Sequence, residues 1–170
     1  MIVNEAYILL GSNLGDRQVN LSNAMVQIAL ECGIITKRSL IYETEPWGFE
    51  GVPDFLNQII IVQTRWQPLT LLIRLLEIEA QLGRVRNPEG NYISRTIDID
   101  LLYFADQIIE SSALTIPHPR LHLRNFALRP LAEISPDFVH PVLRQSSKML
   151  LEKSVDPSKV RVFEPLKSVV

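Results

Sequence analysis

Short apolar runs ended by turn residues alternate in this chain with segments whose apolar residues recur at helical spacing. The runs favour strands at residues 6–10, 34–44, 57–64 and within 95–104, with a further edge strand at 108–109. The helical spacing favours helices around residues 21–32, over 68–82 and over 126–134. Pro68 suits the first turn of the second helix, and Gly33 and Gly83 suit the positions just past two helix ends.

The order of these elements predicts the fold class. Two strand–helix–strand units separated by a loop form the split pattern of a ferredoxin-like α+β sandwich, an antiparallel sheet with helices packed on it. Helices on one face would leave the other face for loops and ligand. We expect one domain over residues 1–170, with a core at about 6–142 and a peripheral polar tail at 143–170 that carries a short helix near 148–153.

Composition and charge narrow the function classes. The chain has 46% hydrophobic and 21% charged residues, as globular proteins do, and no run approaches the ~18 apolar residues of a membrane span. A net charge of −2 argues against a nucleic-acid-binding face, which needs a basic patch. The N-terminus lacks a signal-peptide pattern, and the single cysteine, Cys32, fits a reducing cytoplasm. These features favour a cytoplasmic protein that acts on small molecules.

Two aspartates in the last core strand carry the clearest chemical signal. Asp98 and Asp100 share a face of that strand, roughly 7 Å apart, and Leu102 and Phe104 follow them on it. The opposite face is predicted to carry Ile97, Ile99, Leu101 and Tyr103. Two close carboxylates repel unless a cation lies between them, and their hard oxygens suit Mg²⁺. A charged rim on an edge strand is the alternative interpretation of this pattern alone.

Arginines surround the aspartate pair in the sequence. Arg95 precedes Asp98 by three residues, and Arg84 and Arg86 lie further upstream. The forked guanidinium group matches the geometry of phosphate oxygens. Arginines around two metal-binding carboxylates predict a site for a metal ion and a polyphosphate.

Six motifs in one register closely resemble those of the 6-hydroxymethyl-7,8-dihydropterin pyrophosphokinases of folate biosynthesis. They are YILLGSNLGDR at 7–17, YETEPWG at 42–48, PDFLN at 53–57, GRVR at 83–86, RTIDIDLL at 95–102 and IPHPR at 116–120. The resemblance implies transfer of the terminal diphosphate of ATP to the 6-hydroxymethyl oxygen of the pterin, with release of AMP. It also implies two Mg²⁺ ions held by Asp98 and Asp100, and dihydropteroate synthase as a candidate functional neighbour.

The resemblance further implies roles for individual residues. The catalytic set would be Arg84, Arg95, Asp98 and Asp100. ATP would contact Glu79, Arg84, Tyr92, Arg95, Ile99, Thr115, His118 and Arg124. The pterin would contact Thr44, Pro46, Trp47, Gly48, Phe55, Asn57, Asp98 and Phe126, with the two phenylalanines stacked on its flat ring. The alternatives are surface solvation for the arginines and Glu79, a place in the core for the phenylalanines, and backbone hydrogen bonding for His118.

The chain departs from the family pattern in one loop. Where the family usually has Arg-Trp-Gly-Pro-Arg, this chain has Asn-Tyr-Ile-Ser-Arg at 91–95, so Tyr92 would replace the tryptophan of the closing loop. Ala113 stands where some members carry an arginine, and Leu76 where some carry a polar nucleotide contact.

Two rival functions remain open at this point. One is a nucleotide kinase that transfers only the γ-phosphate, although the chain lacks the G-x-x-x-x-G-K-[ST] motif of the common P-loop enzymes. The other is a non-catalytic pterin-binding module, which would have no need of the intact pair Asp98 and Asp100.

Overall fold

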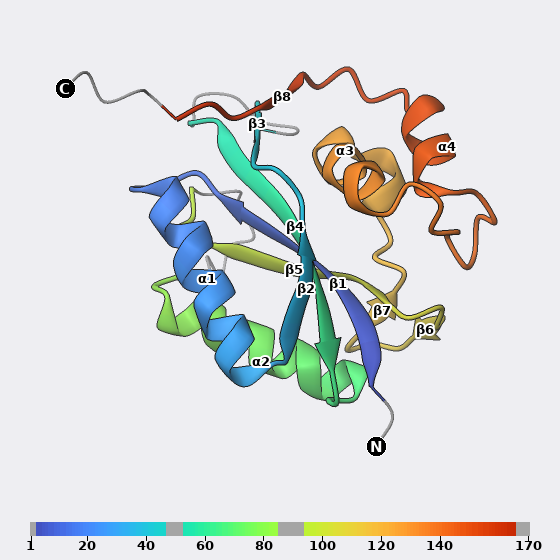
Figure 1. Ribbon diagram of the computed structural model, residues 1–170, viewed down its shortest axis with the longest axis horizontal. Coiled ribbons are helices and arrows are strands. Elements are labelled where there is room, and N and C mark those ends of the chain that lie inside the picture. Colours follow the sequence, from blue (N-terminus) through green and yellow to red (C-terminus); the bar gives the residue numbers. More distant parts are fainter. Residues whose placement is uncertain (1–2, 47–52, 85–93, 166–170) are drawn as a thin grey trace.

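The computed structural model describes residues 3–46, 53–84 and 94–165 (Figure 1). In chain order its elements are β1 (Asn4–Ser12), α1 (Arg17–Glu31), β2 (Ile34–Arg38), β3 (Tyr42–Thr44), β4 (Phe55–Thr64), α2 (Pro68–Gln81), β5 (Asp98–Phe104), β6 (Ile109–Glu110), β7 (Thr115–Ile116), a 3₁₀ turn (Leu121–Leu123), α3 (Asn125–Ile134), α4 (Ser147–Glu152) and β8 (Val160–Val162). Local chemistry explains the helix boundaries. The Asp16 carboxylate caps α1 by accepting from the Val19 N–H at 3.1 Å, and Gly83 adopts a φ of 86° just past α2.

One antiparallel sheet organises the protein. Its strands run in the order β5, β1, β4, β3, β8, and β2 also pairs with β4. The central strand β1 pairs with β4 on one side and β5 on the other. With α1 and α2 as the two connecting helices, this is the ferredoxin-like α+β sandwich that the element order predicts.

The apolar run at 34–44, predicted as one strand, is two strands in the structure. It divides at Ser39 into β2 and β3, which pair with different parts of β4. At the division Gln58 Nε2 donates to the Ser39 carbonyl at 2.7 Å, and the Glu133 carboxylate accepts from the Leu40 N–H at 3.1 Å. The side chains of Gln58 and Glu133 thus satisfy backbone groups that would pair with a neighbouring strand if β2 and β3 were one continuous strand.

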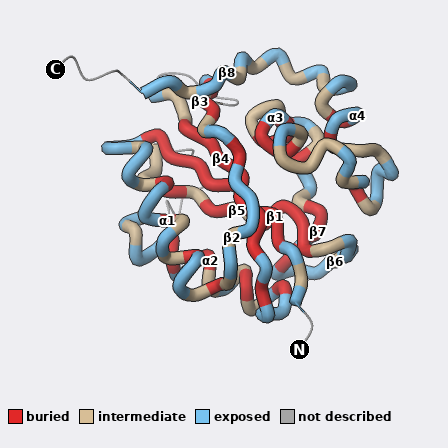
Figure 2. Tube along the Cα trace, in the orientation of Figure 1, coloured by how far each residue is buried: buried red, intermediate tan, exposed pale blue. Residues whose placement is uncertain are grey.

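Both faces of the sheet are covered by helices (Figures 1 and 2). Helices α1 and α2 bury one face over a core that includes Ile8, Ile60 and Leu75. Helix α3 packs on the other face, over Tyr7 and Ile61. The expectation that helices occupy only one face is therefore wrong, because the central strands are apolar on both sides and need cover on both.

A β-bulge in β5 changes which side chains face the core. Ile8 pairs with Leu101 and Tyr7 with Tyr103, so Leu102 is an extra residue without a partner in β1. Beyond the bulge Tyr103 joins the α3 face and Phe104 joins the α1–α2 face, the reverse of the predicted alternation. The alternation holds for Asp98 and Asp100, which precede the bulge.

The segment after α3 returns to the sheet. Helix α4 confirms the short helix expected there and packs against α3. The last strand, β8, pairs antiparallel with β3 and extends the sheet by one strand, which the sequence pattern did not indicate. Strand β6 pairs with β7 in a separate two-stranded sheet. None of the described helices has both the length and the apolar character needed to cross a bilayer.

Candidate active site

A cavity of about 220 Å³ opens at the ends of β1, β3, β4 and β5. It collects ten of the residues that the sequence singles out: Thr44, Phe55, Asn57, Arg84, Arg95, Asp98, Asp100, His118, Arg124 and Phe126. Leu9, Gly11, Glu45 and Arg120 complete its lining. The residues come from segments far apart in the sequence, so the fold brings the motifs together.

Strand register explains how the cavity floor forms. In β1, Gly11 pairs with Asn57 of β4 on one side and with Asp98 of β5 on the other. Two residues earlier, Leu9 pairs with Asp100 in the same way. Because neighbouring strands lie about 4.8 Å apart, the amide of β4 and the carboxylates of β5 face the cavity within two strand spacings.

A second cavity, of about 390 Å³, adjoins the first. Glu79, Ile99 and Thr115 line it, together with apolar side chains that include Leu72 and Leu76. Four residues line both cavities: Arg84, Asp98, Asp100 and His118. The two cavities therefore meet at the predicted catalytic cluster. Leu76 and Ala113, the two departures from the family pattern, both face the second cavity.

Asp98 lies at the centre of an ion-pair network. Its Oδ1 accepts from Arg84, and its Oδ2 accepts from Arg95 Nη1 at 2.6 Å. Arg84 also pairs with Glu79, which is 1% exposed and accepts from the Ile99 N–H at 2.6 Å. Glu79 thereby holds both Arg84 and the start of β5 in place, so it is a buried structural partner of the cluster and not a solvated surface carboxylate.

Asp100 is held in an unfavourable environment for a negative charge. Burial, and then the neighbouring carboxylates of Asp98 and Glu79, raise its pKa to about 7, against the opposing effect of Arg124 and Arg84. A carboxylate in this position is stabilised by a bound cation. The hard oxygens of Asp98 and Asp100 fit Mg²⁺, which takes one or two protein carboxylates and completes its octahedron with water and phosphate. Among the described residues, no three acidic, histidine or cysteine side chains form a group that could hold a metal ion, so the two carboxylates would depend on such additional ligands.

His118 is a neutral donor at the junction of the two cavities. Burial and the nearby cations Arg124 and Arg120 lower its pKa to about 4. Its Nδ1 accepts from the Arg120 N–H at 3.3 Å, so the ring proton lies on Nε2. A neutral imidazole with a protonated Nε2 can donate to a phosphate oxygen without titrating near neutral pH.

The two predicted stacking residues both line the first cavity, each beside an arginine. The guanidinium carbon of Arg95 lies 5.9 Å from the centre of the Phe55 ring, and that of Arg124 lies 5.5 Å from the centre of the Phe126 ring. Asn57 Nδ2 donates to Thr44 Oγ1 at 2.8 Å, which holds the Asn57 amide at the cavity wall. An aromatic and amide-lined region thus borders the arginine cluster.

Three predicted contacts, Trp47, Gly48 and Tyr92, lie outside the described residues. Pro46 is described but does not line either cavity. Like the other assigned substrate contacts, these four remain predictions.

Two residues that the sequence reasoning missed help to shape the site. Gly11 is one, and its signal was a glycine inside a strand, which often marks a close approach of another group. Asn13 is the other: its Oδ1 accepts from the Arg95 N–H at 2.8 Å, and its Nδ2 donates to the Pro53 carbonyl at 3.3 Å. Asn13 therefore ties the backbone of Arg95 to the segment that precedes Phe55.

Replacing Gly11 with alanine should weaken binding in the first cavity. The added Cβ would lie 3.2 Å from Asn57 Oδ1 and 3.8 Å from the Phe55 ring, so the cavity wall would have to move. We expect the KM of the substrate bound in the first cavity to rise about tenfold, while the KM of the substrate bound in the second changes little. Steady-state kinetics with Leu14→Ala, an exposed neighbour, provides the control. Unchanged KM values in Gly11→Ala would contradict the placement of Gly11 at the cavity floor.

The fold and the site together define a class of protein. Two cavities meet at a cluster of carboxylates and arginines; one of them is aromatic and suits a flat ring, and the other has an apolar wall. This is the arrangement of a transferase that moves phosphate groups from a polyphosphate to a second small molecule.

Comparison with known proteins identifies the family. The family model described as 7,8-dihydro-6-hydroxymethylpterin-pyrophosphokinase (HPPK) matches residues 7–136. The chain is 40% identical over 162 residues to the 2-amino-4-hydroxy-6-hydroxymethyldihydropteridine pyrophosphokinase of Bacillus subtilis, a match that covers 95% of this chain and 91% of the relative. The chain belongs to the HPPK family, whose members are ATP-dependent pyrophosphokinases of folate biosynthesis.

Other relatives carry a similar region inside a longer protein. The folic acid synthesis protein fol1 of Pneumocystis carinii is 42% identical over 156 residues, which is 91% of this chain but 21% of that protein. This chain thus spans about a fifth of that relative. The crystal structure of wild-type Plasmodium falciparum HPPK-DHPS with pteroate matches 89% of this chain and 44% of that chain, with a TM-score of 0.73 and 17% identity. At that identity the match supports the fold alone.

Proposed function

We propose that this chain transfers the diphosphate of ATP to the hydroxymethyl group of 6-hydroxymethyl-7,8-dihydropterin and releases AMP, a step of folate biosynthesis. The observation that carries the proposal is that the two cavities share Arg84, Asp98, Asp100 and His118. A pterin in the aromatic cavity and ATP in the second would place their reacting groups at this shared cluster.

In the proposed reaction the pterin hydroxymethyl oxygen forms a bond to the β-phosphorus of ATP. The bond from that phosphorus to the α–β bridging oxygen breaks, AMP leaves, and the hydroxyl proton passes to solvent water. Arg84 and Arg95 would hold the β- and γ-phosphate oxygens, and His118 and Arg124 would donate to the phosphates beside them. No side chain in the cluster stands out as a general base, so positioning and electrostatic stabilisation supply the catalysis.

We further propose that Asp98 and Asp100 hold two Mg²⁺ ions. When bound, such ions neutralise charge on both sides of the β-phosphorus. The raised pKa of Asp100 supports this role, because the nearby arginines do not fully compensate the negative charge of its carboxylate.

At the other substrate, Phe55 and Phe126 would sandwich the flat pterin ring, and stacking of this kind favours planar heterocycles. The Asn57 amide would pair with the ring edge, since an amide offers both a donor and an acceptor. The bond from Asn57 to Thr44 supports this orientation.

The test of the proposed function is an omission series. Consumption of ATP should require the pterin, Mg²⁺ and the protein together, and the pterin product should gain the mass of two phosphates. ATP consumption that persists without the pterin would indicate hydrolysis and contradict the proposal.

The proposal extends to the setting of the reaction. The name HPPK-DHPS of the matched Plasmodium falciparum structure supports dihydropteroate synthase as a functional neighbour. We propose a cytoplasmic location, small-molecule substrates and neither a nucleic-acid nor a membrane partner. The net charge of −2 and the buried thiol of Cys32 support this setting.

A further inference from the structure

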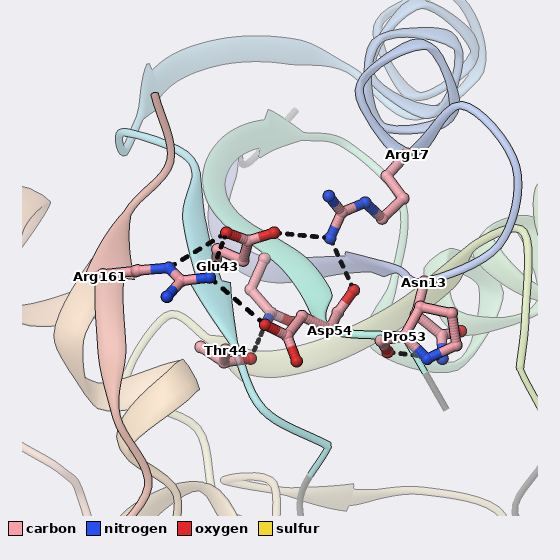
Figure 3. Close-up of polar contacts among 8 residues, drawn as sticks. Asn13, Arg17, Glu43, Thr44, Pro53, Asp54 and Arg161 are labelled. Atoms are coloured by element: carbon pink, nitrogen blue, oxygen red, sulfur yellow. Dashed lines mark hydrogen bonds and ion pairs between the residues drawn. The ribbon is translucent and has the colours of Figure 1, made fainter. Parts of the chain in front are cut away.

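The segment that follows α4 touches two separate walls of the pterin cavity. Its residues 156–163, which we call the C-terminal clamp, contact the β3–β4 wall at one end and the N-terminus of α3 at the other. Figure 3 shows the first of these contacts, where Arg161 of β8 reaches Glu43 and Asp54. Glu43 and Asp54, which the clamp contacts, belong to the six motifs that suggested the family. The residues of the clamp itself belong to none of them.

At the first wall, one carboxylate joins the clamp to the cavity. Glu43 Oε2 accepts from Arg161 Nη2 at 2.8 Å and from Arg161 Nε at 3.1 Å. Its other oxygen, Oε1, accepts from Arg17 Nη1 at 2.9 Å, and the same Nη1 donates to the Asp54 carbonyl at 2.8 Å. Partial burial raises the pKa of Glu43, but the hydrogen bonds from Arg161 and Arg17 outweigh it and hold that pKa below its usual range.

The sequence position of these groups gives the contact its importance. Glu43 directly precedes Thr44, and Asp54 directly precedes Phe55, and both Thr44 and Phe55 line the pterin cavity. The backbone adds to the side-chain contacts, because Val160 of β8 pairs with Thr44 and the Phe163 N–H donates to the Ile41 carbonyl at 2.8 Å. β3 has only three residues, so β8 supplies one of its two ladders.

At the second wall, the clamp caps α3. Asp156 Oδ2 accepts from the Asn125 N–H at 2.7 Å, and the Asp156 carbonyl accepts from Asn125 Nδ2 at 2.7 Å. The preceding residue of the chain, Arg124, makes no side-chain cap of its own at this helix end. A carboxylate from another segment therefore satisfies the first N–H of α3, where negative charge is favoured. Asn125 stands between Arg124 and Phe126, both of which line the cavity.

We infer that the C-terminal clamp sets the spacing between the two aromatic walls of the pterin cavity, and that Asp156 and Arg161 are positioning residues for the pterin. Only four residues separate Asp156 from Arg161, so one short stretch of chain links the wall carrying Phe55 to the wall carrying Phe126. The inference rests on the proposed function, in which those two rings hold the pterin.

Energetics distinguish this role from general stabilisation. The Arg161 side chain is 69% exposed, and exposed ion pairs contribute little to the free energy of folding. The loss of Arg161 should therefore leave the fold intact. The loss of Arg161 should instead lower the affinity for the pterin, since a small misplacement of a binding group has a large effect on substrate binding.

Arg161→Ala and Asp156→Ala in the full chain provide the test. We expect the dissociation constant of 6-hydroxymethyl-7,8-dihydropterin, measured by calorimetry, to rise about three- to tenfold in each variant. The dissociation constant of α,β-methylene-ATP should stay within about twofold, because no residue of the clamp lines the second cavity. Asp156→Asn keeps an acceptor oxygen for the Asn125 N–H and should restore most of the affinity. Lys159→Ala removes an exposed cation from the same segment and is the matched control.

Two outcomes would overturn the inference. Unchanged pterin affinity in both alanine variants would show that the clamp does not position the cavity walls. Equal loss of affinity for both ligands, together with a lower Tm and no rescue by Asp156→Asn, would show a purely structural role. Failure of the proposed function is distinguishable from either, because it would appear in the unaltered protein as the absence of pterin binding or of AMP release.

Discussion

Replacing either Asp98 or Asp100 with alanine should abolish diphosphate transfer while the protein stays folded. Each carboxylate faces the junction of the two cavities, where the transferred phosphates would carry their charge. A metal ion typically supplies several kcal/mol of stabilisation to such a transition state, so we expect kcat to fall by at least about 10³-fold. Turnover measured over a range of Mg²⁺ concentrations checks this prediction.

The structure also indicates how these variants should fold. Asp100 is crowded by Asp98 and Glu79, so the removal of its charge relieves repulsion, and the Tm of Asp100→Ala should not fall. Asp106→Ala, which removes an exposed carboxylate just past the end of β5, is the matched control and should keep full activity. Wild-type-like turnover in either active-site variant would contradict the assignment of the metal ligands.

Phe126→Ala should weaken pterin binding by about 1–3 kcal/mol and leave ATP-analogue binding almost unchanged, since the lost terms are ring burial and stacking. Phe126 lines the first cavity and not the second. Calorimetry with each ligand separately would measure the two effects.

Phe138→Ala is the appropriate control for this experiment. Phe138 packs against Tyr7 and Tyr103, with ring centres 4.8 and 4.7 Å apart, on the same face of the sheet but away from the cavity. Its removal should lower the Tm without selective loss of pterin affinity. An equal loss for both ligands in Phe126→Ala would instead identify Phe126 as a core residue.

Local sequence patterns were sufficient for most elements of the fold. The helices and the pairing of β1 with β4 and β5 follow from apolar periodicity, from Pro68 and Gly83, and from the order of the elements. The break at Ser39 and the bulge at Leu102 could not be predicted in this way. Each depends on partners far away in the sequence, Gln58 and Glu133 in one case and the register with β1 in the other.

The residues of the candidate site also fall into those that the local sequence indicates and those whose role depends on tertiary contacts. Asp98, Asp100 and the arginines carry a chemical signal in their own sequence. The roles of Glu79, Asn13 and Asp156 arise only when the fold brings them to Arg84, Arg95 and α3. β8 has too few residues for a detectable alternation, and its pairing with β3 is a tertiary contact.

The most direct test of the account is the identity of the nucleotide product. The protein should be incubated with ATP, Mg²⁺ and 6-hydroxymethyl-7,8-dihydropterin, and the products separated by chromatography. Attack at the β-phosphorus predicts AMP in a one-to-one ratio with a pterin that carries two phosphates. ADP with a singly phosphorylated pterin would instead show a γ-phosphate kinase, and binding of both ligands without any nucleotide product would show a binding module; either result would contradict the account.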